Sequence, residues 1–429
     1  MTSRLREVVA AASIVAVLAG TAGCSSGSGT SKGSGKLTVW LMVDAQESWP
    51  DLVETVNTRF KQAHPGTDVA VEYQQWTTKN LKLDAALAGR DVPDVVEMGN
   101  SETVNYIVNG AFATVDPAKF DQSAQWLPAL REPCEDNGKT YCVPYYVGAR
   151  VGIYRTDLFQ QAGLTKAPDT YPELISDLDA LKAKFGAADK AFSAFYMPGR
   201  YWYAAMAFVK DTGGEIAVKK DGKWQSALSS PKSVEGLKAW KALIDAYYVG
   251  DRSKDNGDEP AVVGQGKVGV FYGNTWEADS AADPQGGGNP DLKGKFASFA
   301  FPGPSGSGPL PPFLGGSELA VPVKSKNQDL AQEWIKLFTD RTSQQRLIKA
   351  NTLPNNSAQL GEVDAGGVNG PAAKAATRGW VTPQAPGWVA VEKANILPEM
   401  LEDIATGKHS VEDATKTADG RIDAVINKN

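Results

Sequence analysis

The chain has 429 residues, and its 44 Lys and Arg against 50 Asp and Glu give a formal net charge of −6 at pH 7. This acidic balance, without a run of basic residues, excludes a surface built to hold nucleic-acid phosphates. The roughly 390 residues that follow the N-terminal region are too many for one hydrophobic core, so we expect two lobes.

The N-terminal segment reads "MTSRLREVVAAASIVAVLAGTAGC". Two basic residues, Arg4 and Arg6, precede an apolar run from Val8 to Leu18. This run is too short to span a membrane, and the pattern is typical of a secretory signal. We therefore expect an exported protein.

Small residues precede Cys24, and the Ser/Gly tract "SSGSGTSKGSGK" follows it. The pattern predicts a lipoprotein signal at 1–23, with Cys24 lipidated as the mature first residue and 24–36 as a flexible tether. Thr21 departs from the aliphatic residue usual at that position, so secretion with Cys24 removed or unpaired remains the alternative. We expect the protein on the extracellular face of the cell membrane, held by a lipid anchor.

Strands and helices alternate in the first part of the mature chain. The β-rich runs are "KLTVWLMV", "DVAVEY" and "DVVEMG", at 36–43, 68–73 and 94–99. Between them, apolar residues recur at helical spacing from 49 to 60, and "NLKLDAALAG" predicts a second helix. The alternation predicts a parallel α/β sheet, which binds ligands outside the carboxyl ends of its strands.

Two further cysteines, Cys134 and Cys142, flank the turn sequence Asp136-Asn137-Gly138-Lys139. The turn should bring the cysteines face to face, and an oxidising compartment then favours a disulfide. Metal binding is the rival, but His64 and His409 are the only histidines, which leaves too few partners for a four-ligand zinc site.

The chain from Val151 onward is more helical. A strand is expected at 151–159, at 267–272 and in "ELAVPV", and the last segment, from about 355, reads as helices interrupted by "TPQAPGW". The remaining helices are expected in "YPELISDLDALKAKFG", "RYWYAAMAFVKDTGG", "SPKSVEGLKAWKALIDAYY" and "NQDLAQEWIKLFTD". The second lobe is therefore also α/β.

Catalytic and cofactor motifs are weak. Gly264 to Gly269 spells G-x-G-x-x-G, but the strand follows the glycines, where a dinucleotide site needs it before them. A turn into a strand is the better interpretation. His64 and His409 lie in surface sequences, and no G-x-S-x-G occurs. We expect no catalytic residue, cofactor or metal, although a glycosidase using two carboxylates stays open.

Aromatic residues in polar loops are the informative class. They occur in "YQQW", "VPYYVGAR", "GRYWY", "NTWE" and "APGW". A sugar ring has apolar C–H faces and a polar edge, so sugar sites combine flat rings with amides, carboxylates and Arg. Trp240 and Trp334 instead lie within apolar helical faces, and we assign them to the core.

The chain resembles the extracellular sugar-binding lipoproteins of actinobacterial ABC importers, which are family 1 solute-binding proteins. The resemblance covers Leu37 to about Ile426. Within the family it is most similar to binding proteins for N,N′-diacetylchitobiose and related chitin fragments, although relatives for cellobiose and α-glucosides share the same frame. Cys142 departs from the family, where Gly is common. The segments that carry the resemblance are "LTVWLMVDAQESWP", "PDVVEMGNSE", "GKTYCVPYYVGARVGIYRTDLF", "GNTWEA", "FLGGSELAVPVKSKNQDLAQEWIKLFTD" and "APGWVAVEKANILPEML".

This resemblance implies the α/β fold of type II periplasmic binding proteins, with two lobes and a ligand cleft between them. The first lobe would take 37–147 and 317–353, and the second lobe 148–316 and 354–429. The protein would act as a monomer that binds a small oligosaccharide by lobe closure and delivers it to the membrane subunits of the permease. An extracellular glycoside hydrolase that uses two acids of the cleft is the rival from another class.

The resemblance also implies the residues of the site. Hydroxyl-binding groups at strand ends would be Asp44, Asn100, Ser101 and Glu102. Residues stacking on sugar rings would be Trp202, Tyr203, Trp276 and Trp388. Residues lining the crossings between lobes would be Tyr145, Tyr146, Arg150, Gly316 and Ser317. Glu277 would accept a hydrogen bond from a hydroxyl or cap the next helix.

Overall fold

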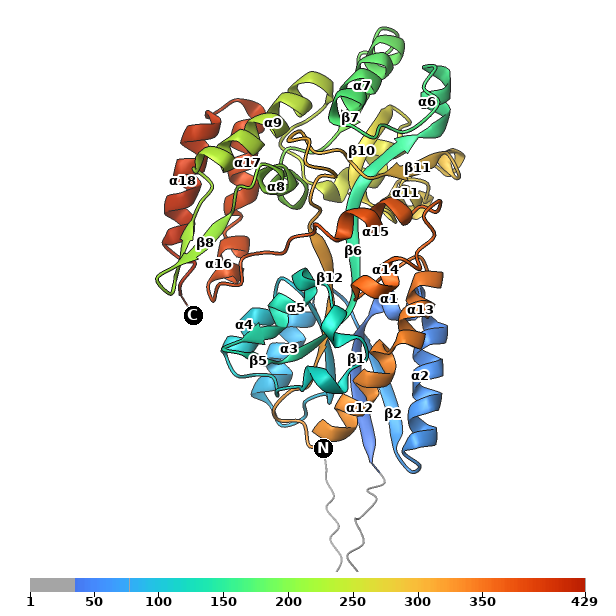
Figure 1. Cartoon of the computed structure of the whole chain (residues 1–429), viewed down its shortest axis with the longest axis vertical. Coiled ribbons are helices and arrows are strands. Elements are labelled where there is room, and N and C mark those ends of the chain that lie inside the picture. Colours follow the sequence, from blue (N-terminus) through green and yellow to red (C-terminus); the bar gives the residue numbers. More distant parts are fainter. Residues whose placement is uncertain (1–34, 77, 429) are drawn as a thin grey trace, which may run out of the picture.

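One long strand, β6 (Cys142–Arg155), runs through both lobes of the molecule (Figure 1). The computed structural model describes residues 35–76 and 78–428. β6 belongs to a mixed sheet with the strand order β2-β1-β3-β12-β6-β10-β7. Its first half pairs with β12 (Leu314–Ala320) and its second half with β10 (Val268–Asn274), so the two lobes share one hydrogen-bonded ladder.

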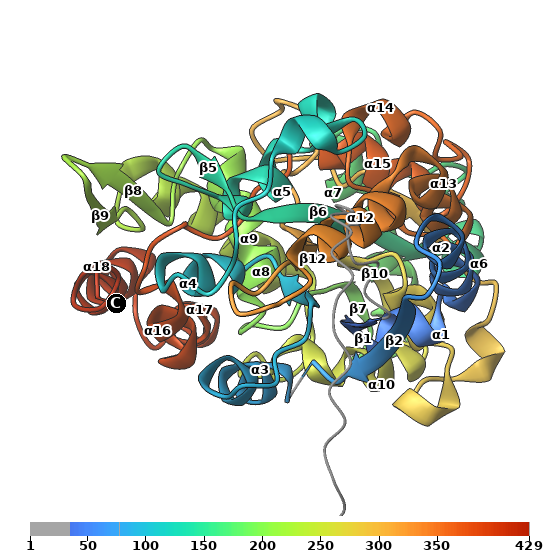
Figure 2. The same cartoon turned by 90° about the horizontal axis from the view of Figure 1, so that it is seen from below.

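The first lobe is built on the parallel strands β1 (Lys36–Met42), β2 (Asp68–Gln74) and β3 (Val95–Gly99). Helices α2 (Pro50–Ala63) and α12 (Gln328–Thr339) lie side by side against this sheet (Figure 2). The predicted strand and helix order of this lobe is confirmed. The buried side chains of α2 recur at helical spacing: Leu52, Val53, Val56 and Phe60.

In the second lobe, β10 runs parallel to β7 (Ser193–Tyr196). β11 (Phe296–Phe299) pairs with the end of β6. Helices α8 (Trp202–Asp211) and α9 (Pro231–Tyr247) pack against each other beside these strands. The remaining strands of the whole molecule are β4 (Glu135–Asp136), β5 (Lys139–Thr140), β8 (Ala217–Lys220), β9 (Lys223–Ser226) and β13 (Leu353–Pro354).

The other helices, from the N-terminal to the C-terminal end, are α1 (Val43–Glu47), α3 (Lys79–Ala88), α4 (Thr103–Val108), α5 (Pro128–Arg131), α6 (Thr156–Gln161), α7 (Tyr171–Phe185), α10 (Glu259–Gly264), α11 (Glu277–Ser280), α13 (Arg341–Lys349), α14 (Ser357–Leu360), α15 (Gly370–Ala376), α16 (Trp388–Lys393), α17 (Ile396–Thr406) and α18 (Val411–Asp423). Single 3₁₀ turns occupy Pro117–Lys119, Ser123–Gln125, Glu132–Cys134, Asn256–Asp258, Pro284–Gly286 and Pro290–Leu292.

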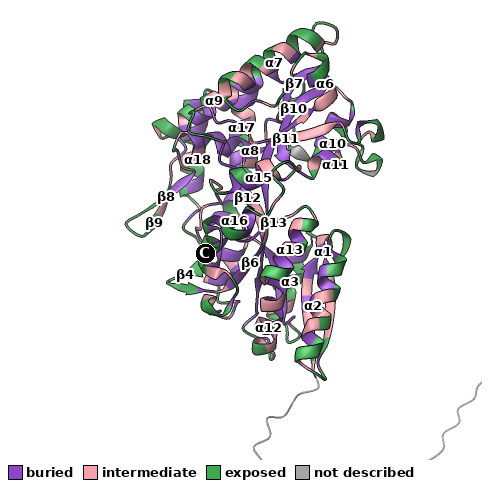
Figure 3. Ribbon diagram, turned by 45° about the vertical axis from the view of Figure 1, so that its right-hand side comes forward, coloured by how far each residue is buried: buried purple, intermediate pink, exposed green. Residues whose placement is uncertain are grey.

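Separate clusters of buried apolar side chains form the cores of the two lobes (Figure 3). Trp334 lies in the first-lobe cluster and Trp240 in the larger second-lobe cluster, each fully buried, so the prediction that both are core residues is confirmed. Leu130 of α5 belongs to the larger cluster, although 37–147 was expected to form the first lobe. The reason is that α5 packs directly on the crossing strands.

The G-x-G-x-x-G sequence is a turn into a strand, as predicted: α10 ends at Gly264, Gly266 has a φ of +78°, and β10 begins at Val268. His409 is exposed at the end of α17, where its ring nitrogen lies 3.0 Å from Asp403. His64 is partly exposed and ends α2.

The strand expected at 151–159 is wrong in its bounds, because its first half continues the crossing strand β6 and α6 begins at Thr156. The strand expected in "ELAVPV" begins earlier, at Leu314, and ends at Ala320. In both places the sequence pattern predicts only the part of the strand that lies within one lobe. In the structure, β6 and β12 pair with each other and continue through the crossing between the lobes.

Cys134 and Cys142 are joined by a disulfide whose Cα atoms lie 5.0 Å apart. The hairpin between them turns through Asn137 and Gly138, with φ values of +47° and +73°. Both cysteines are fully buried. The bond therefore ties the start of β6 to the hairpin that precedes it.

Within the part of the chain that the structure describes, no helix combines the length and the apolar character that a membrane span requires. The predicted signal at 1–23 and Cys24 lie outside the described residues. Only the last two residues of the expected tether, 24–36, fall within them.

We predict that reducing the disulfide lowers the free energy of unfolding by about 2 kcal/mol, because the bond closes a short loop in the unfolded chain. Denaturant unfolding with and without reductant measures this difference. Without reductant, a thiol assay on denatured protein should find Cys134 and Cys142 unreactive. Two reactive thiols at these positions would contradict the pairing.

Candidate functional site

Polar and aromatic side chains gather at the carboxyl ends of β1 and β3. Asp44 lies in α1, directly after β1, and its Oδ2 accepts a hydrogen bond of 2.6 Å from Nε1 of Trp76. Trp76 is 38% exposed. Its ring lies over Gly99, where an added Cβ would be 3.4 Å from the ring. Asp44 therefore holds an exposed indole at the end of the sheet.

Glu102 is engaged by Lys79. Lys79 is 3% exposed and forms an ion pair with Glu102. Its Nζ also lies 5.3 Å from the centre of the Trp76 ring. Burial lowers the pKa of Lys79 to about 8, and the charges of Glu97 and Glu318 oppose that shift. Glu102 therefore orders the cation beside Trp76.

Asn100 and Ser101 face the crossing and the other lobe. The side chain of Asn100 is buried and donates a hydrogen bond of 2.6 Å to the carbonyl of Leu314, and its backbone N–H donates to Gly316. Ser101 hydrogen bonds with Tyr203 of the second lobe. Asn100 thus fixes the second crossing, and Ser101 connects the lobes.

Two carboxyl groups are buried beneath this surface. Glu97 is 2% exposed, and its Oε2 accepts a hydrogen bond of 2.7 Å from the backbone N–H of Met42. Glu318 is fully buried and accepts a hydrogen bond of 2.8 Å from Thr103. Burial raises the pKa of Glu97 to about 7 and raises the pKa of Glu318 well above its usual value.

The crossing strands bring the predicted lining residues together. Tyr146 faces Ser317 across the ladder, and Gly316 lies so close that an added Cβ would be 2.2 Å from the carbonyl oxygen of Tyr146. Tyr145 is fully buried, and its hydroxyl accepts a hydrogen bond of 2.5 Å from Trp49. Tyr145 therefore belongs to the core under the crossing.

Arg150 lies among aromatic rings on the second-lobe side of the crossing. Its Nε donates a hydrogen bond of 2.5 Å to the hydroxyl of Tyr201. The guanidinium carbon lies 5.1 Å from the ring centre of Tyr201, 5.2 Å from that of Tyr203 and 5.4 Å from that of Phe313. These cation–π contacts fix the charge of Arg150 between the two lobes.

Trp202, Tyr203 and Trp388 form one aromatic group. Trp202 and Tyr203 stack with ring centres 3.9 Å apart, and Trp388 lies 6.0 Å from Trp202. Trp202 is 8% exposed, whereas Trp388 is fully buried. The expectation of a loop position for Trp388 is wrong: it begins helix α16, and its Nε1 donates to Glu392. The Gly and Pro before Trp388 mark the helix start and not a free loop.

Trp276 follows the end of β10 and is 52% exposed. Its ring covers Gly148 of β6, where an added Cβ would be 2.6 Å from the ring carbons. The absence of a side chain at Gly148 thus lets the indole lie directly on the crossing strand, while half of its surface stays open to solvent. Trp276 is the most exposed tryptophan among the described residues.

Glu277 turns inward. Its Oε1 accepts a hydrogen bond of 2.8 Å from Asn274, and its Oε2 lies against Gly273. Helix α11 has no side-chain cap. Glu277 therefore contacts the end of β10 and does not cap α11.

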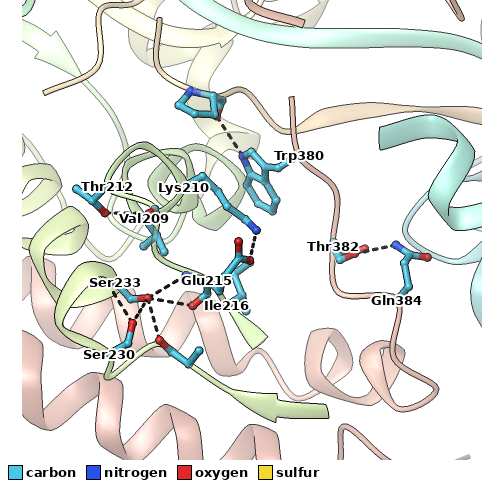
Figure 4. A network of polar contacts seen from close by, with 12 residues as sticks. Val209, Lys210, Thr212, Glu215, Ile216, Ser230, Ser233, Trp380, Thr382 and Gln384 are labelled. Atoms are coloured by element: carbon cyan, nitrogen blue, oxygen red, sulfur yellow. Dashed lines mark hydrogen bonds and ion pairs between the residues drawn. The ribbon is translucent and has the colours of Figure 1, made fainter. Parts of the chain in front are cut away.

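A pocket of about 470 Å³ is lined by none of these residues. Lys210 pairs with Glu215 in its wall, and its Nζ lies 5.8 Å from the ring of Trp380 (Figure 4). The Trp380 ring contacts Phe313, which in turn lies 4.5 Å from Tyr203. The ring of Phe313 therefore lies between Trp380, in the pocket wall, and Tyr203 of the aromatic group beside Arg150.

Sequence reasoning placed Trp76 among the loop aromatics without naming it as a site residue, and it missed the groups that support the exposed residues: Lys79, Glu97, Glu259 and Glu318. For two of these residues the signal is present, since Glu97 lies between the apolar residues Val96 and Met98 of an expected strand and Glu318 begins the apolar segment "ELAVPV". A carboxyl group kept inside a buried strand needs a partner or a proton. Within the described residues, no group of His, Cys, Asp and Glu is arranged to hold a metal ion.

Comparison with known proteins identifies related chains. The family model described as bacterial extracellular solute-binding protein matches residues 56–365. The diacetylchitobiose binding protein DasA of Streptomyces coelicolor is 33% identical over 434 aligned residues, which cover 97% of this chain and 98% of that protein.

Two solved structures share the fold. The sugar-binding protein MalE of Xanthomonas citri has a TM-score of 0.77 and 20% identity, over 92% of this chain and 98% of its own. The GacH receptor of Streptomyces glaucescens has a TM-score of 0.72 and 21% identity, over 92% and 99%. These similarities confirm the expected two-lobe fold of periplasmic binding proteins.

We predict that Glu97→Gln stabilises the protein at pH 8 by on the order of 2 kcal/mol. The pKa of Glu97 is about 7 in the fold and lower in the unfolded chain, so wild type loses stability as the pH rises from about 4 to 7. The gain should therefore shrink at pH 5. Denaturant unfolding at both pH values checks this, with the exposed Glu54→Gln as control. A gain independent of pH would contradict it.

Proposed function

Because the chain belongs to the family of bacterial extracellular solute-binding proteins, we propose that it binds an oligosaccharide between its lobes and presents it to an ABC permease. It is a binding protein of an importer and not an enzyme. A single chain supplies groups from both lobes, including Asp44 and Trp276, so we propose that it acts as a monomer.

The exposed ring of Trp276 carries this proposal. An indole that is 52% exposed and lies against Gly148 offers apolar surface to a ligand. Trp76 offers a second exposed ring from the first lobe, beside Asp44. Flat rings with charged groups around them suit a sugar, whose C–H faces stack and whose hydroxyls need hydrogen-bond partners.

We further propose that the sugar is N,N′-diacetylchitobiose or a related chitin fragment. The diacetylchitobiose-binding relative aligns over nearly the whole of both chains, which supports this assignment. Cellobiose or an α-glucoside in the same role is the alternative.

Lobe closure supplies the transport signal in this proposal. The crossing strands β6 and β12 are paired from Cys142 to Ala149, so the lobes move by bending one ladder. A sugar that contacts both lobes favours the closed state by its extra contacts there. The permease then recognises that state.

We predict that wild type binds N,N′-diacetylchitobiose more tightly than cellobiose, maltose, trehalose or xylobiose in calorimetry. Trp276→Ala should weaken binding roughly tenfold or more, because a stacked ring contributes about 1–3 kcal/mol. Its melting temperature without sugar should stay near that of wild type, since the ring is half exposed.

The matched control is Trp334→Ala in the first-lobe core. It should lose about 3–5 kcal/mol of folding stability and keep its affinity in the folded fraction. Tightest binding of cellobiose or maltose would replace the chitobiose assignment, and the absence of binding to every sugar would overturn the proposed function. A large fall in melting temperature for Trp276→Ala, with normal affinity, would assign that ring to the core.

We propose that Cys24 carries a lipid anchor that holds the protein outside the cell membrane. The apolar run, the small residues before Cys24 and the Ser/Gly tract after it support this. Wild type expressed in an actinobacterial host should partition into the membrane fraction. Cys24→Ala should reduce the share of the protein in the membrane fraction and increase the share outside it. Equal partitioning of both proteins would contradict lipidation.

A further inference from the structure

Two carboxyl groups meet behind Trp276. Glu259, the first residue of α10, is 3% exposed, and Glu277 is the first residue of α11. Both carboxyl groups contact Gly273: a Cβ added there would be 1.8 Å from Oε2 of Glu277 and 3.3 Å from Oε1 of Glu259. Glycine at this position is what allows both side chains to approach the strand.

Within the described part of the chain, three of the four carboxyl oxygens of Glu259 and Glu277 lack a donor. Among the described residues, no hydrogen-bond donor reaches either oxygen of Glu259 or Oε2 of Glu277. Ionised carboxylates only accept hydrogen bonds, so two of them side by side would repel each other and stay unsatisfied. A single proton resolves this, because one carboxyl group then donates to the other.

The charges around the pair favour one negative charge on it. Arg150 faces the pair from β6, and Tyr196 of β7 and Tyr201 before α8 lie within electrostatic range of Glu259. Arg150 stabilises a first carboxylate charge, while the tyrosines carry none at neutral pH. Burial, together with the charge of Glu277, raises the pKa of Glu259 well above its usual value.

The position of Trp276 depends on this pair through Glu277. Oε1 of Glu277 binds the amide of Asn274, whose own Oδ1 lies beside Gly148, 3.5 Å from an added Cβ there. Trp276 lies between Asn274 and Glu277 in the sequence, and its ring covers the same Gly148. A displacement of the Glu277 carboxylate therefore breaks the hydrogen bond that joins the residues on either side of the indole.

We propose that Glu259 is a positioning residue that shares one proton with Glu277 and thereby holds Trp276 in its sugar-binding position. The inference rests on the proposed function, because its main test measures sugar affinity. Loss of the shared proton leaves two adjacent negative charges, so the Glu277 carboxylate is expelled from Gly273. Sugar affinity is then full at low pH and falls as the pH rises through the titration of Glu259.

The experiment is calorimetry of wild type and Glu259→Gln with N,N′-diacetylchitobiose from pH 6 to pH 10. Wild type should lose at least about tenfold in affinity over this range, like the loss expected when the Trp276 ring is removed. Glu259→Gln donates its amide N–H to Glu277 without a titrating proton. It should bind within about threefold of wild type at pH 6 and keep that affinity at high pH.

The matched control is Glu392→Gln, which alters a partly buried carboxyl group of the second lobe. Burial raises the pKa of Glu392 to about 7, and its partner is Trp388, away from Gly273. This variant should keep the pH dependence of wild type. If Glu259→Gln does not fold, Glu277→Gln removes the same shared proton, because its amide donates to Glu259, and it should abolish the pH dependence.

The outcomes separate the two proposals. Binding by wild type that does not change with pH, or Glu259→Gln binding with the slope of wild type, overturns the positioning role. No sugar binding by wild type at pH 6 contradicts the proposed function instead. The shared proton is then tested by unfolding: the stability of Glu259→Gln relative to wild type should increase from pH 5 upward, because wild type must keep a carboxyl group protonated. A constant difference overturns the shared proton.

Discussion

The candidate site depends on two glycines of the crossing strands, each of which lies in close contact with a neighbouring group. Gly148 admits the ring of Trp276, and Gly316 lies against the carbonyl of Tyr146. A side chain at either glycine would push the ring or the opposing backbone away. The strands that join the lobes are thus also the surface on which the exposed aromatic side chain rests, so the geometry of the crossing and of the proposed ligand surface cannot change independently.

Buried and partly buried carboxyl groups support the exposed aromatic rings in both lobes. Glu97 and Glu318 lie beneath the Trp76 side, and Glu259 and Glu277 behind Trp276. Burying such groups opposes folding unless a donor, a cation or a proton compensates them. Lys79 provides the cation in the first lobe and Arg150 in the second. These carboxyl groups therefore position the side chains of the candidate site, while their burial lowers the free energy of unfolding.

The fold could be predicted from the sequence because alternating strands and helices, the turn at Asn137-Gly138 and the apolar faces of Trp240 and Trp334 are local signals. The position of Trp276 at a strand end was also readable. Trp388 was not, because "APGW" looks the same whether the ring points to solvent or into the core. The carboxyl pair at Gly273 joins residues from two helices and a strand, so no spacing in the sequence reveals it.

The position of β12 late in the sequence affects how the chain folds. β12 inserts between β3 and β6, yet it is Leu314–Ala320, more than 150 residues after β6 begins at Cys142. The first lobe cannot complete its sheet until about three quarters of the chain is available. Contacts of such long sequence separation form slowly, so the nascent polypeptide stays unfolded for longer. Slow folding of this kind suits a chain that must be threaded through a secretion channel before it can reach its native state.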